Sequence, residues 1–127
     1  MNSARKVNKR QKWYISHEIL YFVTKPSRSE QREKSLVWEN LILLNARNAE
    51  DAYRKAMKLG QLNEQKVRIG EKEGFLRFKG LRDLVAIHDE LKNGAELEWR
   101  EFRIDAAKLK AMITPKRRLH AFRSAGG

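Results

Sequence analysis

The chain of 127 residues has no cysteine, only two prolines and no long hydrophobic run. Without cysteine there can be no disulfide, no thiolate zinc site and no cysteine nucleophile, which suits a reducing compartment. No apolar stretch approaches the roughly 20 residues that cross a membrane, and the N-terminal MNSARKVNKRQK lacks the apolar centre of a signal peptide. We therefore expect a cytoplasmic protein with no membrane partner.

The residues that are present fit one globular domain. Hydrophobic residues make up 41% of the chain and charged residues 35%, a composition typical of a folded protein with charged surfaces rather than of a disordered chain. The length suits a single hydrophobic core. We predict one domain over residues 13–114, with a basic tail at 1–12 and another at 115–127.

The formal net charge of +12 is concentrated at the two ends of the chain. Residues 1–12 and 106–127 contain cations and no acid, whereas residues 13–105 are nearly neutral. Unpaired basic tails bind polyanions by releasing counterions, although short basic termini also occur as ends that only aid solubility. If the tails are functional, we predict contact with nucleic acid or a ribonucleoprotein, RNA and DNA both staying open, through Arg5, Lys6, Lys9, Arg10, Lys12, Lys116, Arg117, Arg118 and Arg123.

Hydrophobic patterning predicts an α+β fold, with an antiparallel sheet of four to five strands, one main helix packed on it and a short C-terminal helix. Residues 12–24 form a strand with apolar residues on both faces, as in a central strand, and 35–47 form its antiparallel partner. Residues 48–60 form the main helix, with Asn48 as N-cap and a glycine at its end. Residues 105–113 form the short helix, capped by an aspartate.

The remaining strands carry weaker signals. Val67 and Ile69 can belong to a short edge strand. Residues 75–87 read as one or two strands in which Gly80 marks a bulge or bend, because glycine inside a strand pattern usually does so. Residues 95–104 read as a further strand.

An Asn-Gly pair lies between these last two segments, within AIHDELKNGAELEW. A two-residue type I′ turn would mix apolar and polar side chains on both faces. A three-residue loop over 92–94, with Gly94 in the left-handed region, separates the faces better and places Ile87 opposite Trp99, with Leu91 opposite Ala95 and Asp89 opposite Leu97.

This loop gathers polar side chains on the other face of the predicted hairpin. Opposed like charges cost stability unless a cation or a partner relieves them. A solvated hairpin tip is the plainer interpretation. The functional one is an acidic surface for a basic partner segment, made by His88, Glu90, Glu96, Glu98 and Arg100.

Motifs for catalysis are weak. The chain has no Gly-rich phosphate loop, no G-x-S-x-G elbow and no H-E-x-x-H. His17 and Glu18 are neighbours on a strand and point to opposite faces, so a shared site is not expected. Asp83 with Glu90 and Lys92 loosely resembles the carboxylate and lysine set of metal-dependent nucleases, but E-x-K also recurs elsewhere by chance. We expect no enzyme, no cofactor and no metal, with a nuclease as the open alternative.

Several motifs in order resemble a known family. They are the WY pair at Trp13, LNARNAEDAYRKAMKLG, FKGLRDLVAI and DELKNGAEL, and together they span about residues 13–102. This series is similar to a family of bacterial domains of unknown function, numbered 4288. The resemblance implies a compact α+β domain with no assigned reaction and no established site, and it does not extend to the basic tails.

Two functions follow as expectations. The first is a small non-enzymatic binding module that contacts nucleic acid or a ribonucleoprotein through its basic tails. The alternative is a protein-interaction or regulatory partner, for instance an immunity or defence-associated protein, that acts through its sheet or its acidic hairpin. The sequence leaves the partner and the oligomeric state open.

Overall fold

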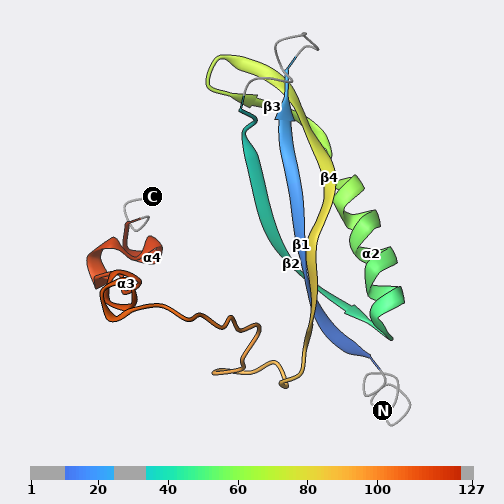
Figure 1. Cartoon of the computed structure of the whole chain (residues 1–127). Coiled ribbons are helices and arrows are strands. Elements are labelled where there is room, and N and C mark those ends of the chain that lie inside the picture. The colour runs from blue at the N-terminus through green and yellow to red at the C-terminus, as the bar shows by residue number, and fades with distance from the viewer. Residues whose placement is uncertain (1–10, 25–33, 124–127) are drawn as a thin grey trace.

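The computed structural model describes residues 11–24 and 34–123. One antiparallel sheet with the strand order β2-β1-β4-β3 carries a helix on one face, which confirms the predicted α+β fold (Figure 1). The elements are β1 (Lys12–Val23), β2 (Val37–Ala46), α2 (Ala49–Leu62), β3 (Gln65–Ile69), β4 (Lys72–Ile87), α3 (Ala106–Ala111), the 3₁₀ turn η1 (Lys116–Arg118) and α4 (His120–Arg123).

The central strand β1 separates two faces of the sheet. Tyr14 of β1 opposes Leu44 of β2 and Ala86 of β4, and paired residues of neighbouring strands point to the same side. Tyr14 and Leu44 belong to the buried core together with Ala52 and Ala56 of α2. Even-numbered residues of β1 therefore face α2, and odd-numbered residues face the opposite side, which we call the open face.

The helix α2 begins where the sequence predicts and ends two residues later than predicted. The side chain of Asn48 accepts a hydrogen bond from the backbone N–H of Asp51 at 2.8 Å, as expected of an N-cap. Gly60 does not end the helix. It is buried against β4, where an added Cβ would overlap the ring of Phe78. Gly60 thus allows close approach of α2 to the sheet.

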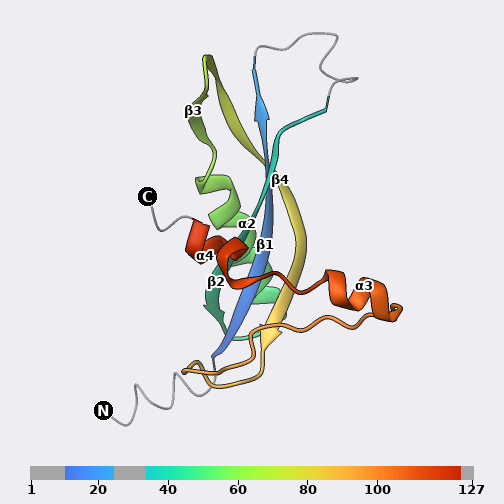
Figure 2. The same ribbon diagram turned by 90° about the vertical axis from the view of Figure 1, so that its left-hand side faces the viewer.

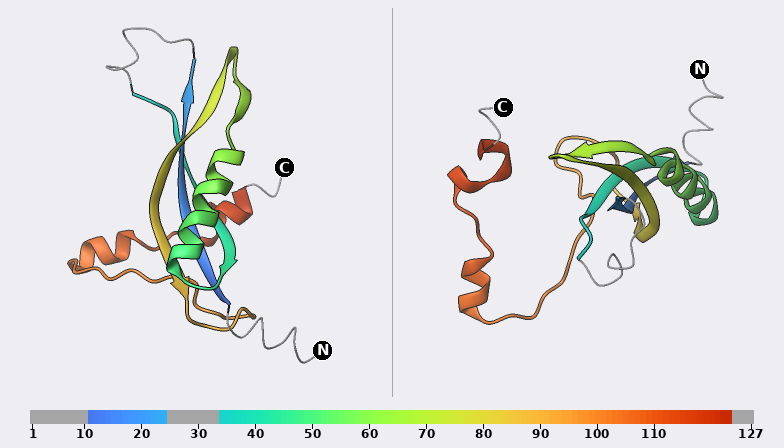
Figure 3. Two further views of the ribbon diagram at one scale, coloured as in Figure 1. Left: turned by 90° about the vertical axis from the view of Figure 1, so that its right-hand side faces the viewer. Right: turned by 90° about the horizontal axis from the view of Figure 1, so that it is seen from above.

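The strand β4 carries the irregularity that Gly80 predicts. Its pairing with β1 shifts register twice, between His17 and Glu18 and between Ile19 and Leu20, and Gly80, with φ of 148°, lies between the shifts. β4 is one continuous strand, and the predicted edge strand around Val67 is β3. Figure 3 shows the strong bend of β4 along its length.

The strand predicted over residues 95–104 is not formed, so that expectation is wrong. Gly94 takes the positive φ expected of the loop, 89°, and the N–H of Ala95 donates to the carbonyl of Lys92 at 3.0 Å. Beyond the turn, however, the side chain of Asp89 accepts the N–H of Glu96 at 2.9 Å. This bond diverts the chain from β4, and none of the three predicted cross-strand pairs exists.

The C-terminal segment stands apart from the sheet in Figure 1, and in the view of Figure 2 α4 lies in front of the sheet. Asp105 caps α3 through a 2.8 Å hydrogen bond from the N–H of Lys108, as predicted. The stretch predicted as a plain tail from residue 115 contains η1 and α4. Every residue from 101 to 123 is exposed. In the described part of the chain, no helix is long and apolar enough to cross a membrane.

Candidate functional sites on the open face of the sheet

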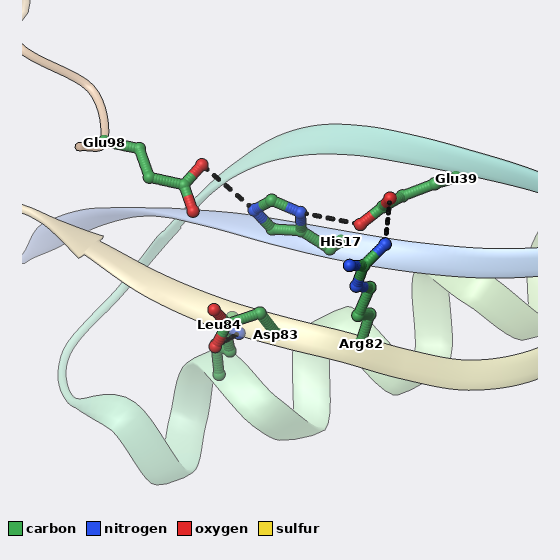
Figure 4. A network of polar contacts seen from close by, with 6 residues as sticks. All are labelled: His17, Glu39, Arg82, Asp83, Leu84 and Glu98. Atoms are coloured by element: carbon green, nitrogen blue, oxygen red, sulfur yellow. Dashed lines mark hydrogen bonds and ion pairs between the residues drawn. The ribbon is translucent and has the colours of Figure 1, made fainter. Parts of the chain in front are cut away.

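A buried histidine organises the middle of the open face. His17 is only 3% exposed, and its Nδ1 lies 3.0 Å from a carboxylate oxygen of Glu39 on β2. Its Nε2 lies 3.1 Å from a carboxylate oxygen of Glu98, which belongs to the segment after β4 (Figure 4). Each ring nitrogen therefore has a carboxylate partner, one from β2 and one from the segment after β4.

Electrostatics extend this cluster to β4. The hydrogen bond from His17 is the main cause that holds the pKa of Glu39 below its ordinary value; burial acts in the opposite direction, and the charge of Arg82 adds to the lowering. The Arg82 guanidinium donates to the second carboxylate oxygen of Glu39 at 3.0 Å. The contacts therefore run from Arg82 through Glu39 and His17 to Glu98, and they hold the segment after β4 against the sheet.

A second polar group lies buried on the helix side. As the sequence predicts, Glu18 points away from His17, and one of its carboxylate oxygens accepts a hydrogen bond from the Asn63 side chain at 2.9 Å. The other oxygen, and the hydroxyl of Ser16, are buried with no partner among the described residues. The sequence analysis did not single out Ser16 and Glu18 as a buried polar pair. Their spacing of two residues on a central strand, which places both on one face, was the signal that could have identified them.

The predicted acidic contact surface is assembled only in part. Glu98 is bound to His17, and together with His88 and Glu96 it lines a hollow of about 220 Å³. Glu90 and Arg100 are exposed and do not line that hollow. The structure therefore brings together three of the five predicted residues.

The nuclease-like set of Asp83, Glu90 and Lys92 does not come together around that hollow. Asp83 lines it, but Glu90 and Lys92 do not. Asp83 also accepts the N–H of Leu84 at 2.8 Å. Within residues 11–24 and 34–123, no group of three or more histidine or acidic side chains is placed to hold a metal ion.

The far end of the open face, beside β3, is basic and aromatic. A hollow of about 640 Å³ is lined there by Phe75, Arg77, Lys66 and Arg68, among others. The Cζ of Arg77 lies 5.3 Å from the Phe75 ring centre, and the Nζ of Lys66 lies 5.8 Å from it. These cations were missed because residues 13–105 are nearly neutral as a whole. The spacing K-x-R in one strand and F-x-R in the next was the available signal.

The predicted tail cations are exposed wherever the structure describes them. Lys12 begins β1, and Lys116, Arg117, Arg118 and Arg123 lie in η1 and α4. The Nζ of Lys116 lies 5.3 Å from the ring centre of Phe122. The other predicted contacts, Arg5, Lys6, Lys9 and Arg10, lie outside the described residues.

Comparison with known families shows which family the chain belongs to. The family described as Domain of unknown function (DUF4288) matches residues 13–99. The chain belongs to this family. The match confirms the resemblance seen in the sequence. The matched residues include the four strands, α2 and the contact between His17 and Glu98, while α3, η1 and α4 lie beyond them. No curated protein and no solved structure matches the chain.

Proposed function

We propose that this DUF4288 protein is a small nucleic-acid-binding protein of the bacterial cytoplasm that performs no catalysis. The observation that carries the proposal is the C-terminal segment after residue 105, which holds six cations and no acid. All six are exposed, on a segment that stands away from the sheet. Cations held in this way are free to approach phosphates and to release their counterions.

The test is binding of the full chain to labelled oligonucleotides, measured by fluorescence anisotropy. A single-stranded RNA and a duplex DNA of the same length are titrated between about 50 mM and about 200 mM salt, and we expect binding to weaken steeply over that range. Changing Lys116, Arg117, Arg118 and Arg123 together to Gln should reduce the slope of log affinity against log salt by up to about 3 to 4.

The control removes cations from another exposed surface. Arg54→Gln with Lys58→Gln, both on the exposed side of α2, should change the slope less for each charge removed. If the full chain binds neither oligonucleotide at about 50 mM salt, where counterion release favours binding most, the proposal is wrong.

A second candidate function is contact with a protein partner through the open face. It is favoured by the exposure of large apolar side chains where an open sheet usually carries polar ones. Trp13, Leu41 and Leu43 are 40%, 57% and 49% exposed. A regulatory or immunity-type partner would cover them. If such a complex exists, Leu41→Glu should abolish it in size-exclusion chromatography, whereas the control Leu62→Glu, at a more exposed leucine on α2, should leave it intact.

A further inference from the structure

We propose that one end of the open face binds single-stranded nucleic acid by stacking a base at Phe75. This inference rests on the proposed function and names a binding site for it within the domain rather than in the tails. We call the site the cation–aromatic end of the sheet, made of Tyr21, Lys66, Arg68, Phe75, Arg77 and Lys79.

The strand pairing places these side chains on one surface. Phe75 of β4 opposes Val23 of β1 on one side and Lys66 of β3 on the other, and Arg77 opposes Tyr21. Because paired residues share a face and Tyr21 is odd-numbered, all of these side chains belong to the open face. The β3 end of the sheet lies opposite the N-terminal end of β1 (Figure 1), so this site is separate from the apolar surface around Trp13.

The aromatic ring is accessible and is accompanied by cations. Phe75 is 41% exposed, and Lys66 and Arg77 approach its ring within 5.8 Å and 5.3 Å. Lys79 similarly lies 5.8 Å from the ring centre of Tyr21. Sequence-tolerant binding of single strands uses this combination, in which rings or guanidinium planes stack on bases and cations follow the backbone.

The hollow beside Phe75 has a suitable size and charge. Its volume of about 640 Å³ is within the usual range for sites that enclose a small molecule, so a nucleobase with its sugar and phosphate fits. Among the described residues of its lining, Glu73 is the one acid, against the cations Lys66, Arg68 and Arg77. Lys66 and Arg68 are two residues apart on a strand, about 7 Å along it, and can therefore contact successive phosphates.

A glycine allows the β3–β4 hairpin to approach the end of β1 closely. Gly74 lies in the lining of the hollow, and a Cβ added there would overlap the carbonyl oxygen of Val23 and come within 2.8 Å of the Phe22 ring. The β3–β4 hairpin therefore packs closely on the end of β1, which fixes Phe75 beside the hollow.

A single strand suits this site better than a duplex. In a duplex the faces of the bases are stacked on one another, so a protein ring cannot reach them unless a base is extruded. Phosphate contacts alone would make no use of the exposed ring. We therefore expect the aromatic contribution to appear with single strands only.

The test uses the full chain and a labelled single-stranded oligouridine, with the same length of oligothymidine and a duplex DNA in parallel. Phe75→Ala should weaken binding of both single strands by about 5- to 150-fold, the range for loss of one stacked base, and leave the salt slope and duplex binding unchanged. Phe75→Tyr should restore the affinity, because it keeps the ring. Arg77→Gln should reduce the single-strand salt slope by about 0.7.

The control is Tyr53→Ala, which removes another exposed aromatic ring, on α2 and away from both proposed binding sites. It should have little effect. If Phe75→Ala is harmless while the four C-terminal Gln substitutions abolish binding, the inference is overturned and the tail-based function stands. If the full chain binds no nucleic acid at low salt, both are wrong. If heparin, a polyanion without bases, competes equally well against the wild type and Phe75→Ala, stacking is refuted.

Discussion

The face under α2 and the open face are built from alternate residues of the same strands, but α2 covers the first, whereas the segment after β4 covers only part of the second, where Ile15 and His17 are buried. On the helix side, Ala52 and Ala56 are fully buried, and Gly60 brings the helix against the sheet. On the open side, Leu41 and Leu43 are about half exposed, although they are larger and more apolar than the alanines. The large apolar side chains of the open face are left exposed because no helix of the described chain lies over them.

The largest expected difference between the faces is in packing energy. Leu20 is fully buried on the helix side. We expect Leu20→Ala to lower the free energy of unfolding by about 2–5 kcal/mol, because it removes buried methyl groups and leaves a cavity. Leu41→Ala on the open face should change it by no more than about 0.5 kcal/mol. Urea denaturation of the two variants measures both, and equal losses would mean that the open face is covered in solution.

A smaller effect is expected at the polar group beneath α2. Glu18→Ala leaves the half-buried amide of Asn63 without its acceptor. We expect a loss of about 1–3 kcal/mol in the free energy of unfolding. Glu18→Gln keeps an acceptor oxygen and should retain most of that stability. Urea denaturation compares them with Glu71→Ala, an exposed control at the β3–β4 turn. If Ala and Gln behave alike, the bond to Asn63 contributes little.

The smallest effect is expected at the cluster of the open face, in its dependence on acid. Since the folded-state pKa of Glu39 is lowered from 4.5, its stabilisation is present above that pH and is lost as pH falls through the folded pKa. His17→Gln removes the main cause of the lowering. The free energy of unfolding of this variant should therefore fall less steeply between about pH 5 and about pH 3 than that of the wild type.

A second carboxylate supplies the reference for that measurement. The pKa of Asp51 is also lowered, chiefly by a hydrogen bond from the backbone N–H of Arg47, and this contact is independent of His17. Both proteins should keep this part of the acid dependence. Identical slopes in the wild type and the variant would show that the bond between His17 and Glu39 does not persist in solution.

The sequence predicted the elements whose signals are local. The apolar run of β1, the Asn48 cap and the Gly80 irregularity each depend on neighbouring residues, and each is found. The strand predicted after Gly94 is not formed. An extended hydrophobic pattern does not show whether a neighbouring strand pairs with it, and here the N–H of Glu96 donates to the Asp89 side chain instead of to the backbone of a neighbouring strand.

The candidate sites depended on contacts between distant segments. His17 and Glu98 are 81 positions apart, and no pattern along the chain links them. The cation–aromatic end likewise combines residues of three strands. The near-neutral charge of residues 13–105 as a whole gave no sign that cations gather at this place. The statement about candidate sites that held, that His17 and Glu18 do not share a site, needed only the two-residue period of a strand.

The two register shifts in β4 carry a consequence for how this family can vary. One shift alone would exchange the faces of every residue beyond it, which would turn Phe75 and Arg77 toward the helix side. Two shifts restore the original alternation. Relatives with a deletion of one residue near Gly80 should therefore lose the cation–aromatic end, unless an insertion close by restores the residue. Deletions of two residues should be tolerated, so gaps of two residues are the pattern to look for among homologous sequences.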